Sequence, residues 1–349
     1  MWRETTQHER NRRIFEEEFE AFLPPRILDF HVHVFPSETL PPGETYCCAG
    51  HAIHRYDLAD LDRDLAQTYP ARKTFAVCFG LPSVNYDRKA NDGYLARNCD
   101  GRRFFPFRLF DPAEDRPDSL RRDIEKQGFL GIKPYLDYVR KGDPNEVEIR
   151  EMVPDWCMEI VNHCGLIVML HIPRKQRLAD LRNQRQLVEI CETYPRARIV
   201  LAHVGRAYFL KNVAGNLDLL KSLPNLYFDI AMLNHWEVLE YLFQQVPGDR
   251  VLYATDTPIA LAPGKSVEIN DQYTYVTPVP WELSIADDRG RVVFTSFLYE
   301  ELRAIKKAVE RLKLARPFVE GLFYQNGTNL LRSVPRNTLS RGLTGTVTE

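Results

Sequence analysis

Two histidines separated by one residue end an apolar segment near the N-terminus, in the sequence Ile27-Leu-Asp-Phe-His-Val-His33. In an extended strand, residues i and i+2 point to the same side, so the imidazoles of His31 and His33 are expected to project together. Neutral imidazole is a good ligand for zinc and similar metals, and two imidazoles on one face provide half of a tetrahedral site. The remaining ligands must come from other parts of the chain.

Three further metal-capable residues stand at the ends of apolar segments. His171 ends the run LIVMLH, His203 ends RIVLAH, and Asp256 ends RVLYATD. A single histidine in such a place is more often a structural residue with a hydrogen bond. Packing does not readily explain metal-capable side chains at the ends of several segments, and together they indicate a site.

Eight short β-rich segments, each followed by a helical pattern, must position these residues. They are Ile27–His33, Thr74–Gly80, Phe104–Phe110, Leu130–Leu136, Leu166–His171, Arg198–His203, Leu226–Ala231 and Arg250–Asp256. Their spacing is that of βα units, and several are almost wholly apolar, as buried parallel strands are. The pattern predicts an α/β fold, a (β/α)₈ TIM barrel, in which all carboxyl ends of the strands meet at one mouth. A doubly wound open sheet has the same alternation, but the number of units and the lack of a glycine-rich phosphate loop favour the barrel.

The helical patterns and the ends of the chain complete this organisation. The clearest helices between the strands are predicted over 57–69, 146–163, 177–194, 209–223 and 235–245. We expect an N-terminal helical extension over 1–25, the barrel over 26–332 with an insertion over 257–294, and a loose tail over 333–349. Within the insertion, the segment Trp281–Phe294 predicts a hairpin that turns at Asp288-Arg-Gly290, and helices are expected over 296–315 and 317–331.

The composition excludes several classes of protein. With 46 basic and 48 acidic residues, the net charge of −2 gives no reason to expect nucleic acid or an anionic membrane as a partner. No apolar stretch approaches the roughly 20 residues that span a bilayer. The N-terminus lacks the apolar segment of a secretory signal, so the cytoplasm is the expected compartment. An odd number of cysteines, 7, does not predict a disulfide framework.

The order of the candidate residues, with His-x-His on the first strand, His on the fifth and sixth and Asp on the eighth, resembles the amidohydrolase superfamily. Leu201-Ala-His-Val-Gly205 and Tyr253-Ala-Thr-Asp-Thr-Pro258 are similar to its amidohydrolase-related branch, and Phe323–Leu331 is similar to the closing helix of those proteins. That branch contains metal-dependent hydrolases and non-oxidative decarboxylases of aromatic or muconate-type acids. The resemblance covers about residues 26–332.

The resemblance implies one divalent metal ion, with His203 close by, surrounded by His31, His33, His171 and Asp256. Zn²⁺ is the expected ion, with Mn²⁺ and Fe²⁺ as alternatives. The superfamily also offers a binuclear alternative, in which a carboxylated Lys133 on the fourth strand bridges two metals. In either case Asp256 is placed to take a proton from a metal-activated water and return it to a leaving group, while His203 polarises a carbonyl or moves a proton.

These observations predict a metal-dependent hydrolase that uses an activated water on a small lactone, amide or other acyl substrate. The alternatives are a non-oxidative decarboxylase of an aromatic or muconate-type acid and a non-catalytic metal-binding barrel, against which the complete ligand set argues. A carboxylate-bearing small molecule fits the basic residues near the mouth, Lys133, Arg174 and Arg206. The loop Cys47–His54 is expected to line the substrate pocket rather than to form a second zinc site, because it lacks two spaced cysteine pairs. A homo-oligomer is a further expectation, since similar proteins are often dimers.

Overall fold

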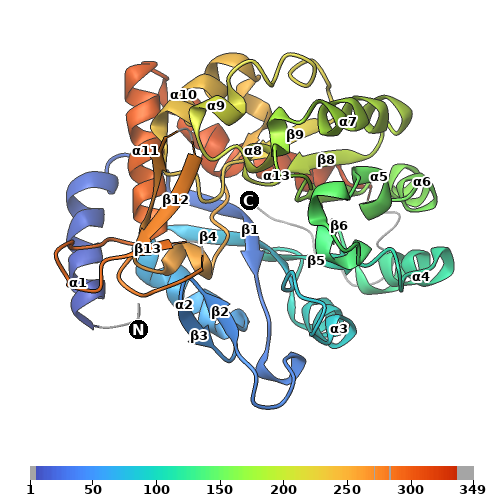
Figure 1. The fold of residues 1–349 in the computed structure, drawn as a ribbon, viewed down its shortest axis with the longest axis horizontal. Helices are drawn as coiled ribbons and strands as arrows, with labels where there is room; N and C mark the ends of the chain where they lie inside the picture. Colours follow the sequence, from blue (N-terminus) through green and yellow to red (C-terminus); the bar gives the residue numbers. More distant parts are fainter. Residues whose placement is uncertain (1–4, 271, 283, 336–349) are drawn as a thin grey trace, which may run out of the picture.

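A closed barrel of parallel strands forms the centre of the molecule. The computed structural model describes residues 5–270, 272–282 and 284–335. Its main sheet has 8 strands, each within or overlapping one predicted segment, so the predicted (β/α)₈ fold is confirmed. In spatial order they are β1 (Arg26–His33), β4 (Lys73–Phe79), β5 (Phe104–Phe110), β6 (Gly131–Pro134), β7 (Ile167–Leu170), β8 (Arg198–Leu201), β9 (Leu226–Asp229) and β10 (Val251–Leu252) (Figure 1). Backbone hydrogen bonds from Phe30 to Tyr253 and from His33 to Thr257 close the ring.

Helices between the strands form the outer layer. They are α2 (Leu58–Thr68), α3 (Arg88–Asn98), α4 (Pro117–Gln127), α5 (Ile149–Met152), α6 (Asp155–Cys164), α7 (Leu181–Thr193), α9 (Leu210–Val213) and α10 (Trp236–Gln245). The carboxylates of Asp57 and Asp180 cap the first backbone N–H groups of α2 and α7. The helix predicted over 146–163 is divided by Pro154, which cannot continue α5. The helix predicted over 209–223 is also wrong, because α9 ends at Val213 and Gly215 turns the chain with a φ of 75°.

The two ends of the chain pack on the barrel. The N-terminal segment forms α1 (Thr5–Ile14) and the π-helical η1 (Phe15–Phe19). The C-terminal segment forms α11 (Phe297–Arg311), α12 (Arg316–Glu320), the π-helical η8 (Gly321–Gln325) and α13 (Asn326–Ser333). A Cβ at Gly327 would lie 2.8 Å from the Leu28 side chain, so glycine allows α13 to approach β1 closely. Most of the predicted tail, 336–349, lies outside the described residues.

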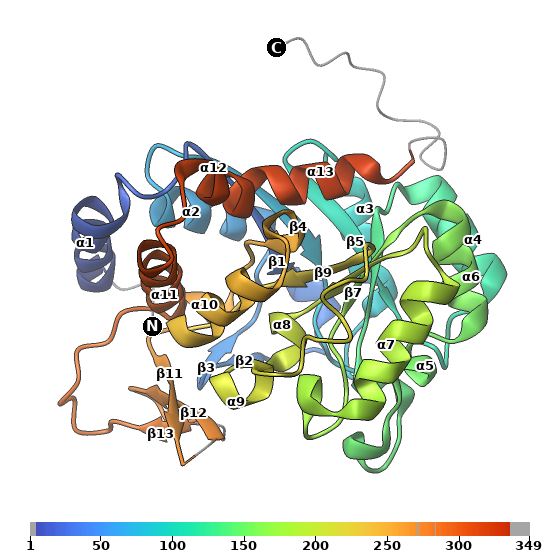
Figure 2. The same ribbon diagram turned by 90° about the horizontal axis from the view of Figure 1, so that it is seen from above.

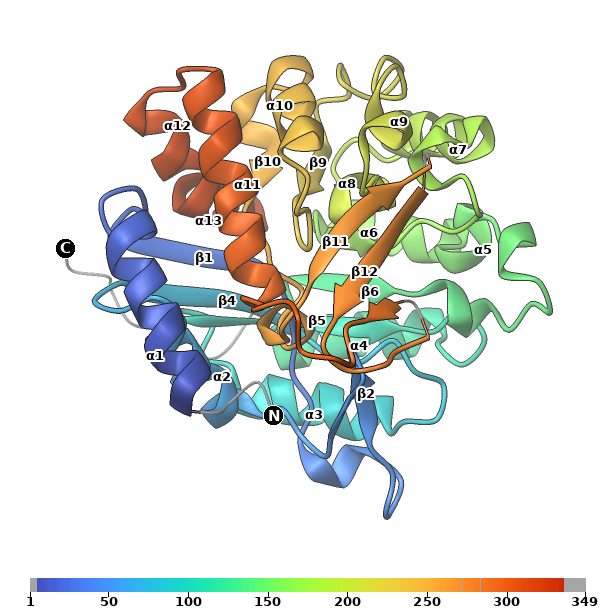
Figure 3. The same ribbon diagram turned by 60° about the vertical axis from the view of Figure 1, so that its left-hand side comes forward.

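The insertion forms a small separate sheet of β11 (Lys265–Ile269), β12 (Gln272–Thr277) and β13 (Ser284–Ala286). It lies on the other side of the barrel from α12 and α13 (Figure 2) and beside α11 (Figure 3). The hairpin predicted over 281–294 is wrong, since β11 pairs antiparallel with β12, and β13 adds to β12 in parallel. The Asp287 carboxylate instead accepts the Val292 N–H and closes a compact turn. Among the described residues, no helix has the length and apolar character needed to cross a membrane.

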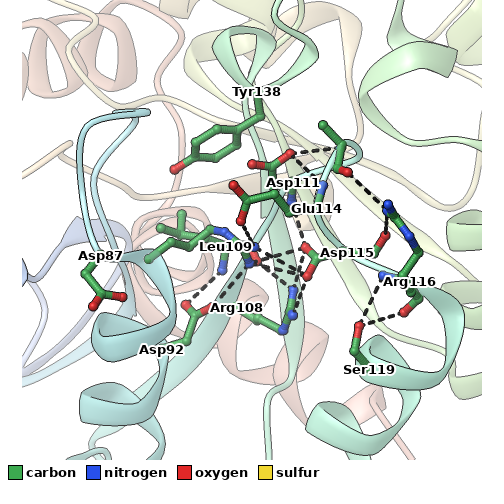
Figure 4. A network of polar contacts seen from close by, with 12 residues as sticks. Asp87, Asp92, Arg108, Leu109, Asp111, Glu114, Asp115, Arg116, Ser119 and Tyr138 are labelled. Carbon is green, nitrogen blue, oxygen red and sulfur yellow. Dashed lines mark hydrogen bonds and ion pairs between the residues drawn. The ribbon is translucent and has the colours of Figure 1, made fainter.

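Two ion pairs, one buried and one with an exposed arginine, hold the carboxyl end of β5 (Figure 4). Arg108 donates two hydrogen bonds to Asp115, at 2.9 and 2.7 Å, and Arg140 donates two to Asp111, both at 2.8 Å. Such bidentate pairs fix geometry as well as adding energy. Because Arg140 belongs to the loop after β6, these pairs join that loop to the loop after β5. The joined loops carry Tyr135 to the mouth of the barrel.

Candidate metal centre

The carboxyl ends of the strands surround a cavity of about 200 Å³ at the mouth of the barrel. The structure brings together on its wall all the residues that the sequence singled out as metal ligands or catalytic groups, namely His31, His33, His171, His203 and Asp256. It adds Cys48, from the loop predicted to line the pocket, and residues that had no individual signal in the sequence: Tyr46, Pro82, Tyr135, Asp137, Pro258 and Ile259.

Three of the histidines are held by hydrogen bonds from Nδ1 to oxygen atoms of the protein. The pairs are His31 with Asp229 Oδ2 at 2.9 Å, His33 with the Gly80 carbonyl at 2.7 Å and His203 with the Ala231 carbonyl at 3.0 Å. Carboxylate and carbonyl oxygens only accept hydrogen bonds, so each Nδ1 carries the proton and each Nε2 keeps its lone pair. This arrangement is typical of histidines that bind metals through Nε2.

The free Nε2 atoms converge on Asp256. Those of His31 and His33 lie 3.3 and 2.9 Å from Asp256 Oδ1, and that of His203 lies 3.9 Å from Oδ2. The ligand atoms of His31, His203 and Asp256 all lie within 4.8 Å of one another. His203 therefore belongs to the tightest group, whereas His171 lines the same cavity outside it, with a buried Nδ1 that has no hydrogen-bond partner among the described residues. Imidazole nitrogens with one carboxylate suit Zn²⁺, Mn²⁺ or Fe²⁺.

Burial and local charge set the protonation of this group. Burial lowers the pKa values of His31, His171 and His203, and the neighbouring Lys133 and Arg206 add to the effect on His31 and His171 respectively. His31, His171 and His203 are thus neutral at neutral pH, as metal binding requires. Burial alone would raise the pKa of Asp256, but His31 and His33 outweigh it and lower the pKa to about 2. The Asp256 carboxylate is therefore ionised at neutral pH.

An unusual backbone presents two of these residues to the cavity. After β8 the chain makes a left-handed turn, α8 (His203–Arg206), in which Val204 has φ 52° and ψ 42° and Gly205 has φ 65° and ψ 37°. His203 and Arg206 also have positive φ, 55° and 60°, as does Asp256 with 70°. Residues with a Cβ rarely adopt this left-handed backbone conformation, and such backbone strain is concentrated at functional sites. In the sequence, only the glycine signals this turn.

Lys133 lies beside His31, one of the candidate metal ligands. It is fully buried, and its Nζ is 3.4 Å from His31 Nε2 and 4.7 Å from the centre of the Phe79 ring. Burial lowers the Lys133 pKa to about 7, against the opposing effect of the nearby carboxylates. Lys133 is not among the residues that line the cavity, so it contacts the site through His31.

The two arginines proposed for substrate binding have different surroundings. Arg174 donates to Asp180 at 2.8 Å, at the start of α7, and is not among the residues lining the cavity. Arg206 donates to the Ile172 carbonyl at 3.1 Å and has no carboxylate partner in the part of the chain that the structure describes. Like Arg174, Arg206 is not among the residues that line the cavity, and its charge adds to the lowering of the His171 pKa.

The loop predicted to line the pocket forms a hairpin of β2 (Tyr46–Cys48) and β3 (His51–Ile53) over the mouth. Tyr46 and Cys48 contribute to the cavity wall, while Cys47 is exposed. Across residues 5–270, 272–282 and 284–335, His31, His203 and Asp256 make up the one compact group of three or more metal-capable side chains, so the hairpin forms no second site of this kind.

Solved structures with the same fold support this interpretation of the architecture. An amidohydrolase from Burkholderia multivorans with bound zinc is 15% identical, with a TM-score of 0.57, and covers 88% of this chain and 99% of that chain. A probable 2-pyrone-4,6-dicarboxylic acid hydrolase from Acinetobacter baumannii is 14% identical, with a TM-score of 0.51 and the same coverage. A dihydroxybenzoic acid decarboxylase from Polaromonas sp. JS666 with bound manganese is 13% identical, with a TM-score of 0.53, and covers 91% of this chain and 100% of that chain.

The family of the chain follows from its sequence rather than from these distant structures. A comparison with curated proteins finds no match. The family model described as Amidohydrolase matches residues 29–276, which include every residue of the candidate centre, and the chain therefore belongs to the amidohydrolase family.

Proposed function

We propose that this protein is a metal-dependent hydrolase that uses an activated water on a small lactone, amide or other acyl substrate. The observation that carries this proposal is the convergence of the Nε2 atoms of His31, His33 and His203 on the Asp256 carboxylate, inside a cavity of about 200 Å³. A structural metal site is closed, whereas this group borders a space that a small molecule can enter.

His31, His33, His171 and Asp256 would hold the metal, with His203 at its edge or as a further ligand. A divalent metal bound there would supply a Lewis acid and lower the pKa of water from 15.7 toward about 7. The ionised Asp256 accepts the proton of the attacking water and returns it to the leaving group. His203 directs the Nε2 lone pair toward the same space, where it can accept and move a proton.

We propose a flat substrate that carries a carboxylate. Tyr46, Pro82, Tyr135 and Ile259 provide apolar surfaces in a space that accommodates about one ring. The Tyr135 hydroxyl is buried without a partner among the described residues, so it is free to donate to a substrate oxygen. Arg206 supplies positive charge for a carboxylate. The dicarboxylic acid named for the Acinetobacter baumannii protein has this chemistry.

The second candidate function is a metal-dependent decarboxylase of an aromatic or muconate-type acid. The aromatic lining of the cavity and the likeness to the dihydroxybenzoic acid decarboxylase favour it. In this reaction the carboxylate of the substrate is the group that is lost. Arg206 and the metal centre would then orient that carboxylate.

A paired assay distinguishes the two reactions. Protein loaded separately with Zn²⁺ and Mn²⁺ is incubated with pyrone carboxylates, other lactones and hydroxybenzoates, and both ring opening and CO₂ release are measured. Ring opening without CO₂ supports the hydrolase, CO₂ release from a carboxylic acid supports the decarboxylase, and a bound metal without either reaction favours a non-catalytic barrel. Arg206→Met should raise KM for carboxylate substrates by about tenfold or more, whereas Arg174→Met, whose arginine is paired with Asp180, should not.

The number of metals is measured on the same preparations. We propose a single ion, because Lys133 Nζ contacts His31 Nε2 directly at 3.4 Å. A carboxylated Lys133 bridging two ions is the alternative, and it requires two equivalents of metal and a mass increase of one CO₂ on the peptide that contains Lys133.

A further inference from the structure

We infer that Glu301, outside the barrel on α11, positions His203 through the peptide bond between Ala231 and Met232. The effect of Glu301 on metal affinity depends on the proposed metal site. Its hydrogen bond to the peptide exists without metal, so the positioning of His203 can be tested in the metal-free protein. Glu301 is therefore a positioning residue rather than a catalytic one.

The contacts form a short relay. Glu301 Oε2 accepts the Met232 N–H at 2.8 Å, and the Ala231 carbonyl accepts the His203 Nδ1 proton at 3.0 Å. The Met232 N–H and the Ala231 carbonyl belong to one planar peptide group, so fixing the first also fixes the direction of the second. A hydrogen bond to the N–H of an amide also polarises its carbonyl and strengthens it as an acceptor.

The backbone conformation at Met232 is strained and needs hydrogen bonds to hold it. Met232 has a φ of 62°, in a region that residues with a Cβ rarely occupy unless their surroundings hold them there. On the preceding side, the Ala231 N–H donates to Asp229 Oδ1 at 3.2 Å. Asp229 and Glu301 thus hold the two ends of a segment whose carbonyl sets the His203 tautomer.

The surroundings of Glu301 indicate that its carboxyl group destabilises the folded protein. The residue has 0% exposure, and Oε1 has no hydrogen-bond partner among the described residues. Burial raises the pKa of Glu301 well above its ordinary value. An apolar side chain would remove this cost but leave the Met232 N–H without its acceptor. We therefore expect the hydrogen-bond acceptor, and not the charge, to be the useful part of Glu301. Glutamine keeps this acceptor, so Glu301→Gln should leave the position of His203 nearly unchanged.

The preceding residue provides a matched control. Glu300 lies on the same helix, one residue away, but its carboxylate accepts from Lys265 Nζ at 2.7 Å and from the Thr295 hydroxyl at 2.7 Å. It has no contact with the Ala231–Met232 peptide. A substitution at Glu300 therefore perturbs α11 and its ion pairs without touching the relay.

The first test follows the His203 ring in metal-free protein by the ¹⁵N chemical shifts of labelled histidines, assigned with a His203→Gln variant. We expect the Nδ1-protonated tautomer in the wild type, Glu301→Gln and Glu300→Gln, and a measurable Nε2-protonated fraction in Glu301→Leu. An unchanged His203 tautomer in Glu301→Leu overturns the inference. If Glu301→Leu does not fold, Glu301→Asp, which withdraws the acceptor by one methylene, is judged by the same criterion.

The second test measures Zn²⁺ affinity by competition with a chelator in a double-mutant cycle with His203→Ala. We expect Glu301→Leu to weaken binding about 10- to 100-fold, and Glu301→Gln and Glu300→Gln to stay within about threefold of the wild type. In the His203→Ala background, Glu301→Leu should cause no further loss, and an equal loss in both backgrounds overturns the inference. A wild-type protein that binds no metal refutes the proposed function instead, while the tautomer measurement still decides the role of Glu301.

Discussion

Replacing Asp229 with asparagine should impair the metal centre without changing any metal ligand. Asp229 Oδ1 accepts two backbone N–H groups, from His203 at 2.7 Å and from Ala231 at 3.2 Å. The oxygen of an asparagine will take this position, because its amide nitrogen cannot accept. The amide N–H group then faces His31 Nδ1, which in the wild type donates to Asp229 Oδ2 at 2.9 Å. Two donors cannot bond, so His31 is forced to accept at Nδ1 and to carry its proton on Nε2, where the metal should bind.

The size of the effect follows from the buried polar groups that this change leaves without a partner. Metal binding to the Asp229→Asn variant must reverse the His31 tautomer and leave the new, uncharged hydrogen bond unmade. A buried polar group left without its partner costs about 1–3 kcal/mol, which corresponds to a roughly 5- to 150-fold weaker metal affinity. Competition of the metal-free protein with a chromophoric chelator for Zn²⁺ near pH 7.5 measures this loss.

Asp29→Asn is the matched control. Asp29 is a buried carboxyl group on the same barrel, and its partners are the backbone N–H groups of His31 and Thr255 and the Thr255 hydroxyl. The hydroxyl can rotate to accept from an amide, so this variant should keep its metal affinity within about threefold. Wild-type affinity in Asp229→Asn would refute the tautomer argument. An equal loss in Asp29→Asn would show that the loss reflects any change in the barrel interior rather than the His31 ring.

Three further substitutions test other parts of the structure. Asp256→Asn should lower kcat by about 10²- to 10⁴-fold with the fold retained, and near-full activity by steady-state kinetics would contradict the assigned proton transfer. Tyr135→Phe removes only a buried hydroxyl that has no hydrogen-bond partner in the described part of the chain. We expect kcat to fall about 10²- to 10³-fold while the free energy of unfolding stays constant or rises by about 1 kcal/mol. Burial raises the pKa of Asp92 to about 7, so the stability linked to this carboxyl is full below about pH 4 and is lost as the pH rises through 7. Asp92→Asn should accordingly raise the free energy of unfolding in urea by up to about 4 kcal/mol at pH 8 and by about 1–2 kcal/mol at pH 5, and an equal effect at both values would contradict this assignment.

The barrel and the place of the site could be predicted because they depend on local patterns. Apolar segments at βα spacing indicate parallel strands, and parallel strands that close a barrel must bring their carboxyl ends together. Asp229 is an acidic residue inside an apolar segment, which requires a buried partner, and the structure shows that this partner is His31. The strands and the buried carboxylate are both recognised from the types of residue in the sequence.

The supports of the histidines could not be predicted, because most of them are backbone groups. The carbonyls that hold His33 and His203 belong to Gly80 and Ala231, and every residue in a chain has a carbonyl. Glu301 is almost 100 residues from His203 in sequence and reaches it only through a folded peptide. The failed hairpin has a related cause, since Asp287 and Gly290 do make a turn, but the partner of a strand depends on the sheet already present.

The features that destabilise the folded chain are concentrated at the mouth of the barrel. Lys133 is fully buried with His31 as its hydrogen-bond partner, and His203, Met232 and Asp256 have left-handed backbone conformations. Each feature destabilises the folded chain, and none improves the packing of the core. The burial of apolar side chains in the barrel provides the stability that offsets them. Strain and buried charge that persist at one place are best explained by what they position, so substitutions that relieve them should stabilise the metal-free protein while weakening metal binding or catalysis.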